Sequence, residues 1–158
     1  MSLEEHVSER PSDRFLYVTE EIASLYDEAS NAIARSPRAS AVLSRACLEA
    51  VLSAMGYKGN LQRKIAAAVS EASPQKSLSA ALRQRLPIIR FIGNSANHSF
   101  KHSNSRICII TADEAEWCLE ILGCVLQEYY EDQEFTETAI MRYIGELRAH
   151  GIVNPPIW

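Results

Sequence analysis

The stretch that decides the fold is Arg38-Ala-Ser-Ala-Val-Leu-Ser-Arg45-Ala-Cys-Leu-Glu49-Ala-Val-Leu-Ser-Ala-Met55. Apart from Arg45 and Glu49, every residue within it after Arg38 is small, apolar or serine. A segment with this composition, ended by Gly56, predicts a helix that other parts of the protein surround on nearly all sides. Arg45 and Glu49 lie four residues apart and so share one face of that helix. We therefore expect them to form a structural ion pair.

Apolar residues recur at helical spacing on both sides of this stretch. The spacing predicts further helices at about residues 20–33, 60–69, 77–92, 111–132 and 136–149. Thr111-x-x-Glu114 is a capping box that opens the fifth of the six helices. Pro87 lies inside the 77–92 helix and is expected to bend it. The sequence thus predicts an all-α fold, an up-and-down bundle of four to five helices.

The ends of the chain differ from its middle. The first dozen residues are polar and include Pro11, which indicates a loose arm, and the last residues include Pro155 and Pro156. The expected division is an N-terminal arm (1–18), a helical bundle (19–132), and a C-terminal helix with an extended tail (133–158).

Charge is distributed unevenly along the 158 residues, whose formal net charge is −4. Residues 58–106 carry nine basic side chains and one acidic one, a net charge of +8. The rest carries seven basic and 19 acidic side chains, a net charge of −12. This asymmetry favours RNA or an acidic protein as a partner of the central segment. Two alternatives remain open: the unlike segments neutralise each other within one fold, or they meet between two copies in a homodimer.

Two classes of protein are excluded by simple patterns. No stretch approaches the roughly 18 consecutive apolar residues of a transmembrane helix, so we expect no membrane partner. The four cysteines form no Cys-x-x-Cys pair, and Cys47, Cys118 and Cys124 lie in apolar helical runs where a thiol is typically buried. A disulfide framework is therefore not expected, and a cytoplasmic location fits best.

The segment with the most distinctive chemistry is Arg90-Phe-Ile-Gly93-Asn94-Ser-Ala-Asn-His98. On an unbroken helix one stripe would contain Lys76, Arg83, Arg90, Asn94 and His98. Such a stripe suits a groove that binds phosphates and presents a histidine, the side chain that titrates nearest to neutral pH. The alternative is an ordinary solvated helix face.

The candidate site has two sets of residues. The catalytic candidates are His98, Arg90 and Asn94, and the candidate RNA or phosphate contacts are Arg83, Arg90, Lys101 and His102. His98 and His102 have the spacing of some metal ligands, but no acidic residue is near them in the sequence. We therefore expect no metal and no cofactor.

Taken together, the Arg38–Glu49 run and the Arg90–His98 run resemble the domain of unknown function 4145, over about residues 20–130. That family belongs to the HEPN-like (higher eukaryote and prokaryote nucleotide-binding) group. The resemblance implies a bundle of four or five helices, often dimeric, found in prokaryotic defence and toxin–antitoxin proteins. It also implies kinship with metal-independent ribonucleases in which an arginine stabilises the phosphate and a histidine transfers protons.

This chain departs from the ribonuclease pattern at one position. His98 matches the motif histidine and Asn94 the polar residue after the arginine, but Gly93 stands where the arginine is expected. Arg90 lies eight residues before His98, about 12 Å along a helix. We therefore expect a domain that binds RNA or a partner protein through a degenerate nuclease motif. Two alternatives stay open: an active ribonuclease with Arg90 or Arg45 on the phosphate, and a structural adaptor or dimerisation domain.

Overall fold

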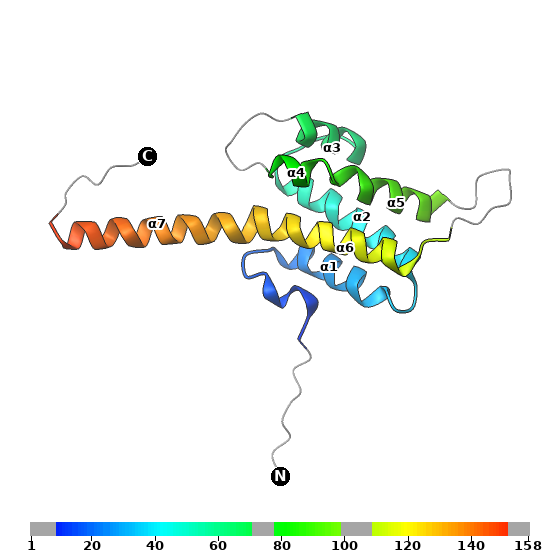
Figure 1. Ribbon diagram of the computed structural model, residues 1–158, viewed down its shortest axis with the longest axis horizontal. Coiled ribbons are helices and arrows are strands. Elements are labelled where there is room, and N and C mark those ends of the chain that lie inside the picture. Colours follow the sequence, from blue (N-terminus) through cyan, green and yellow to red (C-terminus); the bar gives the residue numbers. More distant parts are fainter. Residues whose placement is uncertain (1–8, 71–77, 99–108, 152–158) are drawn as a thin grey trace, which may run out of the picture.

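The computed structural model describes residues 9–70, 78–98 and 109–151, the side chains of His98 and Phe135 excepted. It confirms the all-α bundle. Four helices build its main body: α1 (Glu20–Ala32), α2 (Pro37–Ala54), α5 (Leu86–His98) and α6 (Ala112–Leu126). Shorter helices α3 (Leu61–Ser70) and α4 (Ala80–Arg83) lie beside α5 along one edge of the bundle (Figure 1).

Helix α2 is the centre of the bundle, as its composition predicts. It packs against α1, α5 and α6, and its fully buried side chains include Cys47, Leu48, Val51 and Leu52. The helix begins at Pro37, where the missing N–H of proline costs nothing. The Ser36 side chain caps it by accepting a hydrogen bond from the Ala39 N–H.

The predicted helix at 77–92 is wrong in one respect, because the structure divides it into α4 and α5. The chain turns at Gln84 and Arg85, and Pro87 becomes the second residue of α5. Proline has no N–H to donate, and its ring would collide with the carbonyl group four residues earlier in an unbroken helix. In the first turn of a new helix neither cost arises. Arg83 and Arg90 therefore lie on different helices and do not share one continuous stripe.

Helix α6 also differs from the prediction, because no break separates it from the last helix. The capping box at its start is confirmed, with Thr111 and Glu114 each accepting a backbone hydrogen bond from the other's N–H. At its end α6 passes through a π-helical turn, η2 (Gln127–Glu131), directly into α7 (Asp132–Ala149). Figure 1 shows the three as one long helix whose last part, α7, projects beyond the bundle.

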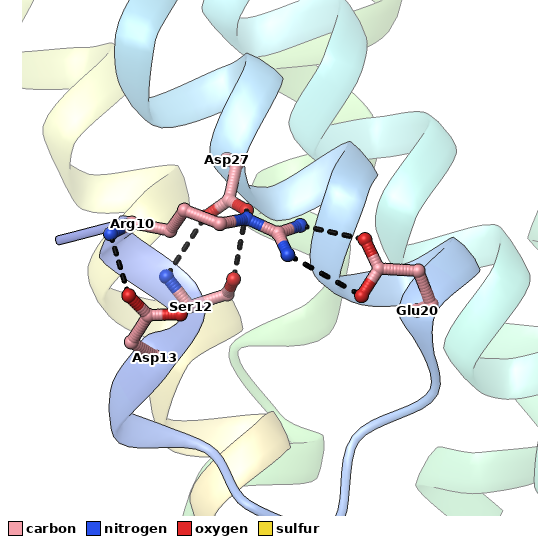
Figure 2. Close-up of polar contacts among 5 residues, drawn as sticks. All are labelled: Arg10, Ser12, Asp13, Glu20 and Asp27. Carbon is pink, nitrogen blue, oxygen red and sulfur yellow. Dashed lines mark hydrogen bonds and ion pairs between the residues drawn. The ribbon is translucent and has the colours of Figure 1, made fainter. Parts of the chain in front are cut away.

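The N-terminal segment is packed rather than loose over its described residues. A short 3-10 helix, η1 (Pro11–Arg14), lies against α1, and the Ser12 and Phe15 side chains are buried. Asp27 on α1 accepts hydrogen bonds from the Ser12 N–H, from the Ser12 hydroxyl and from Arg10 Nε, at 2.7–2.8 Å (Figure 2). Hydrogen bonds to Glu20, and then to Asp27, raise the pKa of Arg10 above its ordinary value. These contacts fasten the segment to α1.

The described cysteines differ in burial, which corrects one expectation. Cys47 and Cys118 are buried, and burial raises the pKa of each thiol to about 12, whereas Cys124 is exposed. In a Cys108→Ser chain at about pH 8, we expect a disulfide reagent to modify Cys124 promptly, because only an accessible thiolate reacts. Cys47 and Cys118 should react only when guanidinium unfolds the protein. The absorbance of the released reagent monitors the reaction. Prompt reaction of all three thiols would contradict the packing of α2 and α6.

Candidate functional site

The two runs that carry the family resemblance lie on α2 and α5 and meet at Gly93. A Cβ atom added to Gly93 would lie 2.6 Å from Arg45 Cβ and 3.1 Å from the Ala41 carbonyl oxygen. The first distance is too short for any Cβ atom and the second is a tight contact, so the two helix backbones approach closely here. Small buried residues on α2, Ser40 and Ala41 among them, allow the approach. Gly93 is therefore required by packing, and an arginine at this position has no room.

The Arg45 side chain extends from α2 across the Gly93 contact and binds α5. Its Nε donates a hydrogen bond of 2.8 Å to Asn94 Oδ1 on α5. Glu49 lies more distantly, with 4.0 Å between its Oε2 and an Arg45 terminal nitrogen. Lys64 of α3, only 8% exposed, is closer to Glu49 at 3.6 Å and also donates a 2.8 Å bond to Ser53 Oγ. The Arg45–Glu49 pair thus belongs to a polar chain that links α5, α2 and α3.

A second arginine of α2 makes a similar crossing near the end of α5. Arg38 Nε donates a hydrogen bond of 2.6 Å to the Ala96 carbonyl oxygen. That carbonyl lies in the last turn of α5, where backbone oxygens lack helical partners and attract cations. Sequence reasoning did not identify Arg38 or Lys64 as contacts of this site. One sequence feature could have identified them as contacts between helices, since each is a basic residue beside an apolar helical run.

Arg90 does not reach the position that a nuclease arginine would need. Helix α5 continues through His98, so eight residues of helix, about 12 Å, separate the two backbones. The Arg90 guanidinium instead donates a 3.2 Å hydrogen bond to Gln62 Oε1 on α3. Arg83 lies farther along the same side and donates hydrogen bonds of 3.3 and 3.5 Å to the carbonyl groups of Ala68 and Val69. The side chain of His98, and all of Lys101 and His102, lie outside the described residues.

Basic and acidic side chains are concentrated on different helices of the described protein. Residues 58–70 and 78–98, which contain α3, α4 and α5, carry six basic side chains and no acidic one. Residues 112–149, which form α6, η2 and α7, carry ten acidic side chains and two basic ones. Of the six basic side chains in residues 58–70 and 78–98, those of Lys58, Arg63 and Arg85 are exposed. We call the described residues 58–70 and 78–98 the basic layer. Helix α5 contributes to this layer and also holds Gly93 and Asn94.

A groove lies elsewhere on the described protein, and none of the candidate residues lines it. It has a volume of about 800 Å³ and lies between η1, α1 and α6, with Arg14, Phe15 and Tyr26 among its lining residues. Its rim is acidic, through Glu116, Glu120 and others, and so does not suit a phosphate. Within the described part of the chain, no group of three or more histidine, cysteine or acidic side chains could hold a metal ion. No helix in that part is both long and apolar enough to span a bilayer.

The comparisons with known proteins give one match. A family model described as "Domain of unknown function (DUF4145)" matches residues 27–140. No curated protein and no solved structure matches the chain. The matched segment begins within α1, ends within α7, and includes the whole contact between α2 and α5. The chain therefore belongs to the family of domain of unknown function DUF4145, as its two motifs predicted.

Proposed function

We propose that this protein is an RNA-binding helical domain that does not cleave RNA. The observation that carries the proposal is the basic layer, residues 58–70 and 78–98, which contains α3, α4 and α5 and carries six basic side chains and no acidic one. Phosphate contacts supply most of the sequence-independent affinity for nucleic acid, and they need exposed lysine and arginine side chains. Lys58, Arg63 and Arg85 meet that need directly. Arg90 adjoins them through its bond to Gln62.

The arrangement of the arginines supports binding without catalysis. A metal-independent ribonuclease needs a charged donor at the phosphate and an acid or base at the same bond. Arg45 and Arg38 instead hold α5 to α2, and Gly93 fills the motif arginine's place for a steric reason. The HEPN-like affiliation, a homodimeric state and a role in prokaryotic defence or toxin–antitoxin systems are further parts of this proposal and rest on the resemblance.

RNA binding is tested by fluorescence anisotropy with a 5′-labelled, mixed-sequence single-stranded RNA of about 20 nucleotides. We expect the double variant Arg63→Gln/Arg85→Gln to bind at least about tenfold more weakly at low salt, because two phosphate contacts are lost. Each single variant should lower the salt slope by about 0.7. The matched control is Arg142→Gln, which removes one charge from α7 and should bind like the unmodified protein.

The recovered RNA distinguishes the proposal from its rivals. Intact RNA on a denaturing gel, with salt-sensitive binding, is the expected result. Cleavage that the His98→Ala variant abolishes would overturn the non-catalytic assignment and establish the ribonuclease. If the RNA does not bind at low salt, the basic layer serves another partner, and the adaptor interpretation replaces this one.

A further inference from the structure

Helix α7 has almost no intrachain partner. Among the described elements it makes substantial contacts only with η2, the turn that precedes it. Figure 1 shows its 18 residues projecting from the bundle in line with α6. A helix of this length extends about 27 Å and would not be stable by itself in water, where helical stability comes mostly from packing an apolar face.

An apolar face of the required kind is present along α7. Ile140, Tyr143, Ile144 and Leu147 recur at helical spacing and form one stripe. Ile140 is 52% exposed and Tyr143 is 58% exposed, values unusual for large apolar side chains of a helix. The stripe covers about two turns of the helix and lies where the bundle no longer reaches it.

The charges beside the stripe indicate what covers it. The first half of α7 is acidic, through Asp132, Glu134 and Glu137. Its second half holds the basic residues Arg142 and Arg148 and one acidic residue, Glu146, which lies away from the flank that Glu137 and Arg148 share. Glu137 and Arg148 are eleven residues apart, close to three helical turns, so they flank the stripe on the same side. In an antiparallel helix pair with two-fold symmetry, each side of the stripe on one helix faces the identical side of the stripe on the other. The midpoint between Glu137 and Arg148 falls inside the stripe.

We propose that α7 is a dimerisation helix that pairs antiparallel with α7 of a second copy of this chain. The stripes of the two helices cover each other, and Glu137 of each copy faces Arg148 of the partner subunit in two symmetric ion pairs. In a parallel pair, Glu137 of one copy and Arg148 of the partner subunit would lie on opposite sides of the interface and at different heights along it, so they could not meet. This inference rests on the homodimeric state included in the proposed function and names its surface. It does not rest on RNA binding, so failure of the dimer test and failure of the RNA test are distinguishable.

Sedimentation velocity of the full chain over about 1–200 μM tests the pairing. We expect a reversible dimer, because a single helix pair gives a contact at the small end of specific interfaces. The variant Ile140→Glu/Ile144→Glu should raise the dimer Kd at least about tenfold. The matched control, Thr138→Glu/Ala149→Glu, adds the same charge to the opposite face and should leave Kd nearly unchanged. A chain that is monomeric throughout, or a face variant that dimerises normally, overturns the proposal.

A charge exchange tests the orientation and separates specific pairing from nonspecific association. Glu137→Arg and Arg148→Glu should each weaken the dimer, since each places like charges opposite one another. The double variant Glu137→Arg/Arg148→Glu should restore it, because the ion pairs re-form with reversed sign. Failure of the double variant to restore dimerisation overturns the antiparallel register. Circular dichroism of each variant checks that the bundle stays helical, as the proposal requires.

Discussion

Replacing Gly93 by alanine is expected to lower the free energy of unfolding by about 2 kcal/mol, the scale of an overpacked core. The new Cβ would lie 2.6 Å from Arg45 Cβ and 3.1 Å from the Ala41 carbonyl oxygen. Neither neighbour is the end of a flexible side chain, so α2 and α5 must separate. Alanine gains about 1 kcal/mol of helix propensity over glycine, which offsets only part of this cost. Chemical denaturation followed by circular dichroism measures the change.

Gly145 provides the matched control for this substitution. It lies within α7, and no atom is within 4 Å of the position that its Cβ would occupy. Gly145→Ala should therefore leave stability unchanged or raise it by up to about 1 kcal/mol. Equal stability of the Gly93→Ala and unmodified proteins would contradict the close approach of α2 and α5. Gly93→Arg introduces the arginine of the ribonuclease pattern that the resemblance implies. It should unfold the bundle rather than produce a nuclease.

Replacing Asp27 by alanine is expected to cost about 3 kcal/mol, through the loss of charged hydrogen bonds and the orphaning of buried donors. Asp27 is 7% exposed and accepts from the Ser12 N–H and the Ser12 hydroxyl (Figure 2). Both donors are in η1, where Ser12 is itself buried. Without the carboxylate, η1 should detach from α1. Hydrogen exchange at residues 9–18, together with thermal unfolding, measures the effect.

A neighbouring aspartate separates this role from a general charge effect. Asp13 accepts a single hydrogen bond, from the Arg10 N–H, and is exposed. Asp13→Ala should cost less than about 1 kcal/mol, as for an exposed capping residue. If Asp27→Ala is no more destabilising than Asp13→Ala, then the contacts in Figure 2 do not fasten the segment.

The helical elements were predictable because each carries a local signal. Apolar spacing, the Ser36-Pro37 boundary and the Thr111–Glu114 capping box lie within a few residues of the structure they determine. The low charge of residues 39–57 predicted that α2 is central, because burial excludes unpaired charge. The family was predictable from the combination of two short runs, Arg38–Glu49 and Arg90–His98.

The errors arose where a contact between distant residues decides the outcome. The division at Gln84 and Arg85 depends on whether a proline bends a helix or begins a new one. In the structure α4 packs on α3 and α6, whereas α5 packs mainly on α2. Cys124 has apolar neighbours in sequence but lies on the exposed side of α6. Gly93 stands out in the sequence only as a departure from the ribonuclease pattern, because the atoms that require a glycine there belong to α2. No local sequence pattern predicts that Arg45 binds Asn94, which lies 49 residues away in the sequence.

The salt dependence of RNA binding tests the central claim most directly. The basic layer, with about four phosphate contacts, predicts that log K falls with log salt at a slope of about −3, while the RNA stays intact. The Arg63→Gln/Arg85→Gln variant should show a slope shallower by about 1.4, and Arg142→Gln should match the unmodified chain. A slope near zero, or one that the double variant leaves unchanged, would contradict RNA binding by the layer of α3, α4 and α5.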